Sequence, residues 1–171
     1  MRSLVALAFL CLSTQALAQL RTVPYVDVSR YLGTWYQIAR NPLVFEGDCI
    51  CSRQILSLRT DGNVGVYNSC NNPYTGAVRE IRGFATNDDA TTNARFTVDF
   101  GLPHKGAYWI IGLDHDYRYA VVSDPSLQSL YILSKTPELP AALYEEAVRK
   151  AAEQLDTSRL TLTEQRGCVY P

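Results

Sequence analysis

The clearest structural pattern in the sequence is the segment Ala94-Arg95-Phe96-Thr97-Val98-Asp99-Phe100. Apolar side chains occupy every second position, and charged or hydroxyl-bearing side chains occupy the positions between them. This period of two predicts a β-strand over residues 94–100, with one face buried and the other face in water.

Seven further segments have the composition of strands, and they follow one another at intervals of about ten residues. One of the turns between them, Thr60-Asp61-Gly62-Asn63, contains the Asp-Gly pair that favours a tight hairpin. Short turns without intervening helices predict an all-β antiparallel meander, which either closes into an up-and-down barrel or folds over as a sandwich. The eight expected strands cover residues 33–40, 52–59, 64–70, 77–85, 94–100, 107–113, 118–123 and 129–135.

The periodicity changes after Pro140. Apolar residues then recur at steps of three and four, which predicts a helix with one apolar face; they are Leu143, Ala147, Val148, Ala151 and Leu155. Residues 159–163 follow as a short ninth strand, with Leu160 and Leu162 on one face.

The composition bounds the function. The chain has 171 residues, of which 47% are hydrophobic and 19% are charged, so a normal core is expected and a disordered or fibrous protein is excluded. The formal net charge of -1 supplies no basic surface for a nucleic acid. We therefore expect no nucleic-acid partner.

The N-terminus has the pattern of a secretory signal peptide. Arg2 precedes a short apolar run, and Ala16-Leu17-Ala18 provides the small residues that a signal peptidase reads. Cleavage would remove residues 1–18 and leave one domain, residues 19–171, without a transmembrane segment. A lipid anchor at Cys11 is disfavoured because Leu10, before it, is not a small residue.

Four of the five cysteines remain after this cleavage, and an even number in an exported chain predicts two disulfides. Cys49 and Cys51 are too close together to bridge comfortably, so each is expected to pair with Cys70 or Cys168. A zinc site is disfavoured because Cys70 and Cys168 are isolated rather than a second close pair. We expect no metal.

Common catalytic signatures are absent: the sequence has no Gly-x-Ser-x-Gly, no His-Glu-x-x-His, no phosphate loop and no dinucleotide fingerprint. His104 and His115 lie in expected turns, where a surface role is the default. Asp114 and Asp116 have the spacing of paired carboxylates, but aspartates also build turns. The sequence therefore predicts that the protein is not an enzyme and carries no cofactor.

An eight-stranded barrel has an interior that side chains fill or that holds one small ligand, and periodicity alone does not distinguish the two. We expect an apolar pocket with few polar groups. The candidate lining residues are Trp35, Gln37, Ala39, Leu56, Val66, Phe96, Val98, Phe100, Tyr108, Ile110 (or its neighbour Ile111), Tyr131 and Leu133.

Three blocks of sequence, in order, resemble the lipocalin family. The first has Gly33-x-Trp35 at the start of the first strand, within residues 31–40. The second covers residues 113–122, with Leu113-Asp114 at its start, and the third covers residues 131–137. The likeness extends over residues 24–168 and is closest to the branch that includes bacterial outer-membrane lipocalins and apolipoprotein D.

The resemblance implies an eight-stranded antiparallel up-and-down β-barrel, with the C-terminal helix packed outside and a short ninth strand. It implies that Trp35 closes the barrel base and that Lys135 lies across it as a cation on a ring. In apolipoprotein D the C-terminal segment is bridged to the start of the second strand. This favours Cys51 with Cys168 and Cys49 with Cys70, although Cys49 is an alternative partner for Cys168.

The resemblance also implies a function: binding, storage or transport of a small hydrophobic molecule, such as a fatty acid or a lysophospholipid, in membrane maintenance under stress. It implies an exported protein, periplasmic or secreted, and leaves peripheral contact with the outer membrane open. Two alternatives remain. A tetrapyrrole or pigment binder would need His104 or His115 at the barrel mouth, and a lipid-modifying enzyme would need a free cysteine or an acid inside the barrel.

Overall fold

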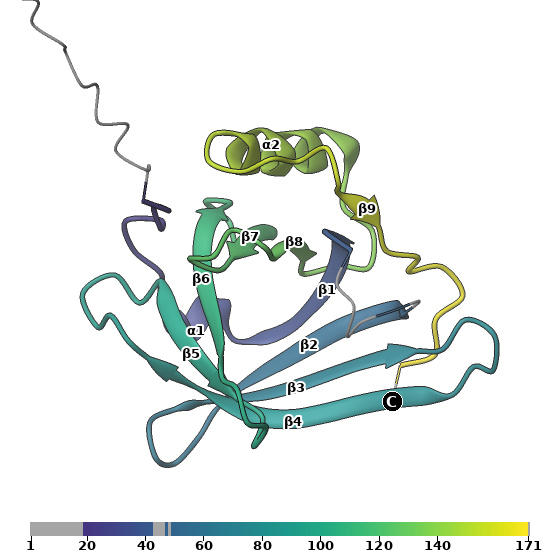
Figure 1. The fold of residues 1–171 in the computed structure, drawn as a ribbon, viewed down its shortest axis with the longest axis horizontal. Coiled ribbons are helices and arrows are strands. Elements are labelled where there is room, and N and C mark those ends of the chain that lie inside the picture. The colour runs from purple at the N-terminus through teal and green to yellow at the C-terminus, as the bar shows by residue number, and fades with distance from the viewer. Residues whose placement is uncertain (1–18, 43–46, 48, 171) are drawn as a thin grey trace, which may run out of the picture.

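Residues 19–42, 47 and 49–170 are described by the computed structural model (Figure 1), so the expected signal peptide, residues 1–18, lies outside the described part of the chain. Eight antiparallel strands follow one another around a closed barrel, because β1 pairs with both β8 and β2. The strands are β1 (Gly33–Arg40), β2 (Ile50–Leu58), β3 (Val64–Asn71), β4 (Val78–Asn87), β5 (Arg95–Asp99), β6 (Gly106–Leu113), β7 (Tyr119–Ser123) and β8 (Leu130–Ser134).

The predicted up-and-down barrel is therefore confirmed, and the boundaries of its eight strands agree with the expected ones to within two residues. The helix after Pro140 is also confirmed as α2 (Ala141–Ala152), which lies against the outside of the barrel on β6, β7 and β8 (Figure 1). The ninth strand, β9 (Thr161–Leu162), is shorter than expected and pairs with the end of β1.

A four-residue helix, α1 (Val28–Tyr31), was not expected from the sequence. Asp27 caps it, because one oxygen of its side chain accepts hydrogen bonds from the backbone N–H groups of Ser29 and Arg30. A helix this short has no amphipathic period to detect. It is followed almost directly by β1, and Tyr31, its last residue, lines the barrel interior.

Two apolar clusters divide the buried side chains. The inner cluster lies inside the barrel and includes Trp35, Ile110 and Val122. The outer cluster lies between the barrel wall and α2, where Ala147 and Ala151 of the helix pack against the sheet. Side chains that alternate along a strand therefore enter two different cores.

The ends of the barrel differ. The β2–β3, β4–β5 and β6–β7 turns lie at one end together with α1, which we call the closed end. The β3–β4, β5–β6 and β7–β8 loops lie at the other, which we call the open end. Within the described ranges, no helix is long and apolar enough to cross a bilayer.

Candidate ligand-binding cavity

The barrel encloses a cavity of about 980 Å³. This volume is at the upper end of the range of small-molecule pockets, roughly 300–1,000 Å³. Its deeper wall is apolar, and exposed residues of the β5–β6 and β7–β8 loops, among them Leu102, His104 and Pro125, surround its mouth. The interior is therefore a pocket that opens at one end rather than a fully packed core.

Most of the residues expected to line a pocket do line this cavity in the structure. Leu56, Val66, Phe96 and Val98 are buried with 6–8% of their surface exposed, and all four line the cavity. For Phe96 and Val98 this is the buried face that the alternation of residues 94–100 predicts. The expected residues that line the cavity are Gln37, Leu56, Val66, Phe96, Val98, Phe100, Tyr108, Tyr131 and Leu133.

Three expected lining residues are placed elsewhere. Trp35 and Ile110 lie inside the barrel in the inner cluster, but they are not among the residues that line the cavity. The expectation that Ala39 lines the pocket was wrong, because Ala39 lies in the outer cluster with the alanines of α2. The pairing of β1 with β8 shifts register between Gln37 and Ala39, and such a bulge moves the following side chain to the other face. Ile111, the alternative to Ile110, also lies in the outer cluster.

The cavity also has polar wall residues that the sequence reasoning missed. Gln54 of β2 donates from Nε2 to the hydroxyl of Tyr108 over 2.7 Å, and the hydroxyls of Tyr108 and Tyr31 lie 2.8 Å apart. Burial raises the pKa of Tyr108 to about 12, and it also raises the pKa of Tyr31 well above its usual value of 10, so both phenols stay protonated at neutral pH. Extending the alternation of β2 backwards from Leu56 would have found Gln54 and Ser52.

At the closed end, Trp35 is fully buried and is held from two sides. Its indole N–H donates to the backbone oxygen of Tyr31 over 2.7 Å, and Lys135 Nζ lies 4.2 Å from the centroid of its ring. The ammonium also donates to the backbone oxygen of Leu32 over 2.6 Å. Burial nevertheless lowers the pKa of Lys135 to about 8. The cation-on-ring contact implied by the family resemblance is present.

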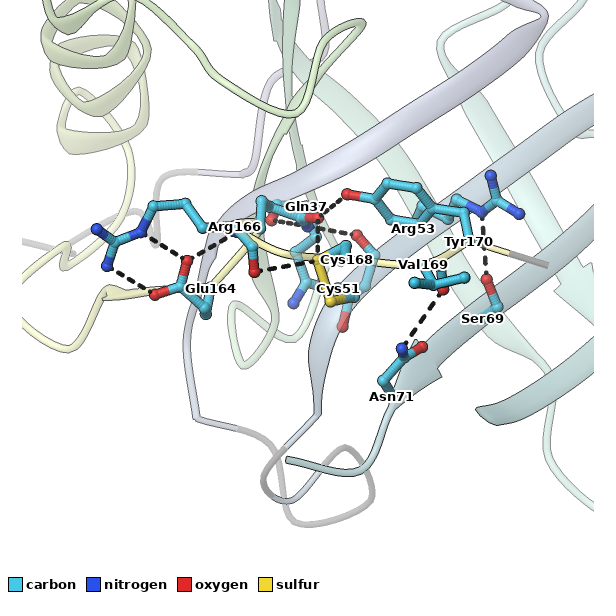
Figure 2. Close-up of a disulfide and its surroundings, with 12 residues drawn as sticks. Gln37, Cys51, Arg53, Ser69, Asn71, Glu164, Arg166, Cys168, Val169 and Tyr170 are labelled. Carbon is cyan, nitrogen blue, oxygen red and sulfur yellow. Dashed lines mark hydrogen bonds and ion pairs between the residues drawn. A yellow bond between two sulfur atoms is a disulfide. The ribbon is translucent and has the colours of Figure 1, made fainter. Parts of the chain in front are cut away.

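The four described cysteines form two disulfides, Cys49–Cys70 and Cys51–Cys168, which is the pairing that the resemblance favoured. Figure 2 shows the second bridge beside Tyr170, whose ring lies 4.8 Å from the guanidinium carbon of Arg53. No described cysteine is a free thiol. The thiol version of the enzyme hypothesis therefore has no nucleophile in this part of the chain.

The C-terminal segment completes the wall where β1 and β2 diverge. The pairing of these strands ends at Tyr36 and Arg53. Beyond that point Gln165 Nε2 donates to the backbone oxygens of Gln37 and Ser52 over 2.9 and 2.7 Å, and Cys51 N–H donates to Glu164. The tail thus bridges the seam with hydrogen bonds, and the Cys51–Cys168 disulfide fixes it there (Figure 2).

The remaining candidate residues have separate roles. Asp114 accepts hydrogen bonds from the backbone N–H groups of Asp116 and Arg118 and from the guanidinium of Arg118, which is the turn role expected for it. His115 is exposed in the same turn at the closed end, whereas His104 lies at the cavity mouth. No group of three potential metal ligands occurs among the residues that the structure describes.

Comparison with known proteins gives the chain its family. A model of the lipocalin-like domain matches residues 26–165. The outer membrane lipoprotein Blc of Escherichia coli K12 is 38% identical over 82% of this chain and 80% of its own, and apolipoprotein D of Cavia porcellus is 32% identical over 83% and 78%. Temperature-induced lipocalin-1 of Arabidopsis thaliana is 32% identical over 86% of this chain and 83% of its own.

Solved structures show the same architecture. Insecticyanin from Manduca sexta superposes with a TM-score of 0.71 at 20% identity, over 87% of this chain and 86% of its own. The amine binding protein of Rhodnius prolixus, solved with tryptamine, gives 0.62 at 21% identity, over 85% and 84%. Together, the family model, the related sequences and the closed barrel show that the chain belongs to the lipocalin family.

Proposed function

We propose that this protein binds and carries a small hydrophobic ligand, a fatty acid or a lysophospholipid, inside its barrel. The observation that carries the proposal is the cavity itself, which is open at one end and has an apolar wall around Leu56, Phe96 and Val98. An apolar chain in such a pocket needs few polar contacts, because each CH₂ removed from water contributes about 0.8 kcal/mol. The affinity should therefore follow chain length, rising about fourfold for each added CH₂ until the cavity is full.

The proposed setting is an oxidising compartment, the periplasm or the outside of a cell. Two disulfides support it, since such bonds persist outside the reducing cytosol. Removal of residues 1–18 as a signal peptide is part of the same proposal. A relative named as an outer membrane lipoprotein and another named as temperature-induced are consistent with a role in maintaining membranes under stress.

A titration with a fluorescent fatty acid tests the proposal. Ile81→Trp places a large ring on the cavity wall, whereas Ile55→Trp places it on β2 outside the cavity lining and serves as the matched control. We expect the first substitution to weaken binding at least tenfold and the second to change it less than twofold. Native mass spectrometry and lipid extraction of the purified protein should show a bound acyl lipid.

An empty barrel that takes up no fluorescent fatty acid would overturn the proposal. Equal loss of binding in both tryptophan variants would also contradict it, because the ligand would then not lie in the cavity.

One observation favours a second candidate, a tetrapyrrole or other pigment. His104 is exposed at the mouth of the cavity, where the imidazole could contact a ring system. Purified protein should then show visible absorbance, and His104→Ala should remove or shift the band. Colourless protein that does not change the spectrum of an added tetrapyrrole would eliminate this candidate.

A further inference from the structure

A cluster of polar side chains lies in the inner part of the cavity, away from its mouth. Three residues that line the cavity form it: Tyr31 of α1, Gln54 of β2 and Tyr108 of β6. The Tyr108 hydroxyl connects the other two, because it accepts from Gln54 Nε2 over 2.7 Å and lies 2.8 Å from the Tyr31 hydroxyl. We call these three side chains the inner polar cluster.

Contacts with Trp35 place the inner polar cluster near the closed end. The ring centroids of Tyr31 and Trp35 lie 4.8 Å apart, and Gln54 is the partner of Trp35 in the pairing of β1 with β2. Apolar residues such as Leu56 and Val66 line the cavity beside it. The cluster is therefore a polar spot on an otherwise apolar inner wall.

The inner polar cluster has more hydrogen-bond donors than the protein can use. Each of the two phenols carries one O–H and the amide carries two N–H groups, so there are four donors. Two contacts connect the three side chains, and each contact uses one donor. These side chains form no other hydrogen bond with a described residue. Two donors therefore remain without an acceptor, whichever way the hydroxyl hydrogens and the amide are oriented.

The unused groups are accessible from the cavity. Gln54 Oε1 has no hydrogen-bond partner among the described residues, yet it is not closed off from solvent. Its amide extends across the barrel interior to Tyr108, so solvent reaches it through the cavity. Tyr108 itself is only partly buried and lines the same cavity. A ligand that fills the inner part of the cavity would displace this solvent, and the unused donors would then need an acceptor on the ligand.

The charge of the inner polar cluster limits which acceptor suits it. Burial raises the pKa of both phenols, that of Tyr108 to about 12, so neither ionises at neutral pH, and the amide carries no charge. A carboxylate or phosphate at this site would lose its hydration to uncharged donors alone, which is costly. A hydroxyl or carbonyl oxygen loses much less hydration and is a good acceptor for an O–H or N–H group.

We propose that the inner polar cluster binds an uncharged oxygen, a hydroxyl or a carbonyl, on the end of the ligand that enters the barrel first. The inference rests on the proposed function, and it narrows the ligand to a lipid that is oxygenated at a position remote from any ionised group. A ligand with a hydrocarbon inner end would leave the two donors unpaired. The cluster therefore selects among lipids that the apolar wall alone would accept equally.

Fatty acids with and without a terminal hydroxyl group test the proposal. Each ω-hydroxy acid is paired with the plain acid of the same chain length, from decanoic to hexadecanoic acid, so that both probes carry the same carboxylate. Displacement of a fluorescent fatty acid from the protein with both disulfides formed gives the affinity ratio of each pair. At one or more chain lengths we expect the wild type to bind the hydroxylated acid at least as tightly as the plain acid, because its hydroxyl has a partner.

The double variant Tyr31→Phe/Tyr108→Phe removes both phenol hydroxyls and keeps both rings. It should weaken binding of those hydroxylated acids about tenfold and leave the affinity for the plain acids within about threefold. Tyr67→Phe is the matched control, because Tyr67 donates to Glu80 and does not line the cavity, and it should change neither affinity. Binding of the plain acids shows that the barrel of each variant is intact.

The wild-type measurements test the inference even without the variants. If every ω-hydroxy acid binds at least tenfold more weakly than its plain partner, the inner end of the ligand meets no hydrogen-bond donor and the inference is wrong. It is also wrong if the double variant keeps the wild-type affinity ratio. In both cases the plain acids still bind and the proposed function stands. A wild type that binds neither the plain acids nor the fluorescent fatty acid overturns the proposed function as well.

Discussion

The closed and open ends of the barrel are held together in different ways. At the closed end, packing and hydrogen bonds converge on Trp35, which is fully buried between Tyr31 and Lys135. At the open end, the cavity replaces the packed core, and the wall is held by two disulfides and the C-terminal segment. Noncovalent packing is therefore concentrated at the closed end, away from the cavity mouth.

Truncation of Trp35 tests this division most strongly. Trp35→Ala should lower the free energy of unfolding by about 3–5 kcal/mol, because it leaves a large cavity and removes the ring beneath Lys135. Phe100→Ala at the open end should cost about 1 kcal/mol, since Phe100 is half-buried and already borders empty space. Urea unfolding with the disulfides intact measures both. Equal losses would show that the two ends do not differ in packing.

The disulfides provide the complementary test at the open end. Replacing Cys51 and Cys168 by serine should cost about 2–5 kcal/mol, and replacing Cys49 and Cys70 should cost about 1.5 kcal/mol less, because the loops closed span 117 and 21 residues. The first variant should also release the C-terminal segment, which proteolysis would detect. If the Cys49–Cys70 disulfide, which closes the shorter loop, proves the more stabilising of the two, the entropy of the unfolded chain does not explain how the disulfides stabilise the open end.

The closed end was also the easier end to predict from sequence. Its features are local: Gly33-x-Trp35 and the Asp114 turn each fix structure within a few residues. Residues of the cavity wall were predicted correctly where apolar and polar side chains alternate along a strand without interruption. Prediction failed at Ala39, because a bulge reverses the face without leaving a signature in residue types. Ser52 and Asn68 also line the cavity, and they were missed because the alternation was not extended along the strands from Leu56 and Val66.

A smaller effect at the closed end is expected from the turn carboxylate. The guanidinium and backbone N–H of Arg118 hold the pKa of Asp114 at about 2, below its ordinary value of 3.8. The folded state therefore gains stability from this group above pH 4 and loses it as the pH falls from about 4 towards 2. Asp114→Asn should cost about 1–2 kcal/mol at pH 7, reduced from the full shift because Arg118 is half-exposed.

The comparison of Asp114→Asn with Asp116→Asn isolates this effect. Asp116 is exposed in the same turn, so its substitution should change stability by less than about 0.5 kcal/mol. Urea unfolding at pH 7 and at pH 2.5 should show a difference between the variants that narrows in acid. A difference that is constant with pH would mean that the charge of Asp114 does not stabilise the turn.

Lys135 provides a second pH-dependent test of the closed end. Its pKa is lowered by burial to about 8, so between pH 8 and 10.5 the unfolded chain binds more protons than the folded one, and stability from this group rises with pH. At neutral pH the buried ammonium is offset by its contacts with Trp35 and the backbone oxygen of Leu32. Lys135→Met should therefore change stability by only about 0.5–2 kcal/mol at pH 7.

The informative quantity is the difference in unfolding free energy between wild type and Lys135→Met, measured at pH 7.5 and at pH 10. Tyrosines that begin to ionise near pH 10 are common to both proteins, so their contribution cancels in the difference. We expect the unfolding free energy of the wild type to rise relative to that of the variant between pH 7.5 and pH 10, because the buried lysine becomes neutral and its charge no longer has to be desolvated. A difference that does not move would mean that Lys135 keeps an ordinary pKa, and that the ring and carbonyl contacts at the closed end fully replace the water that burial removes.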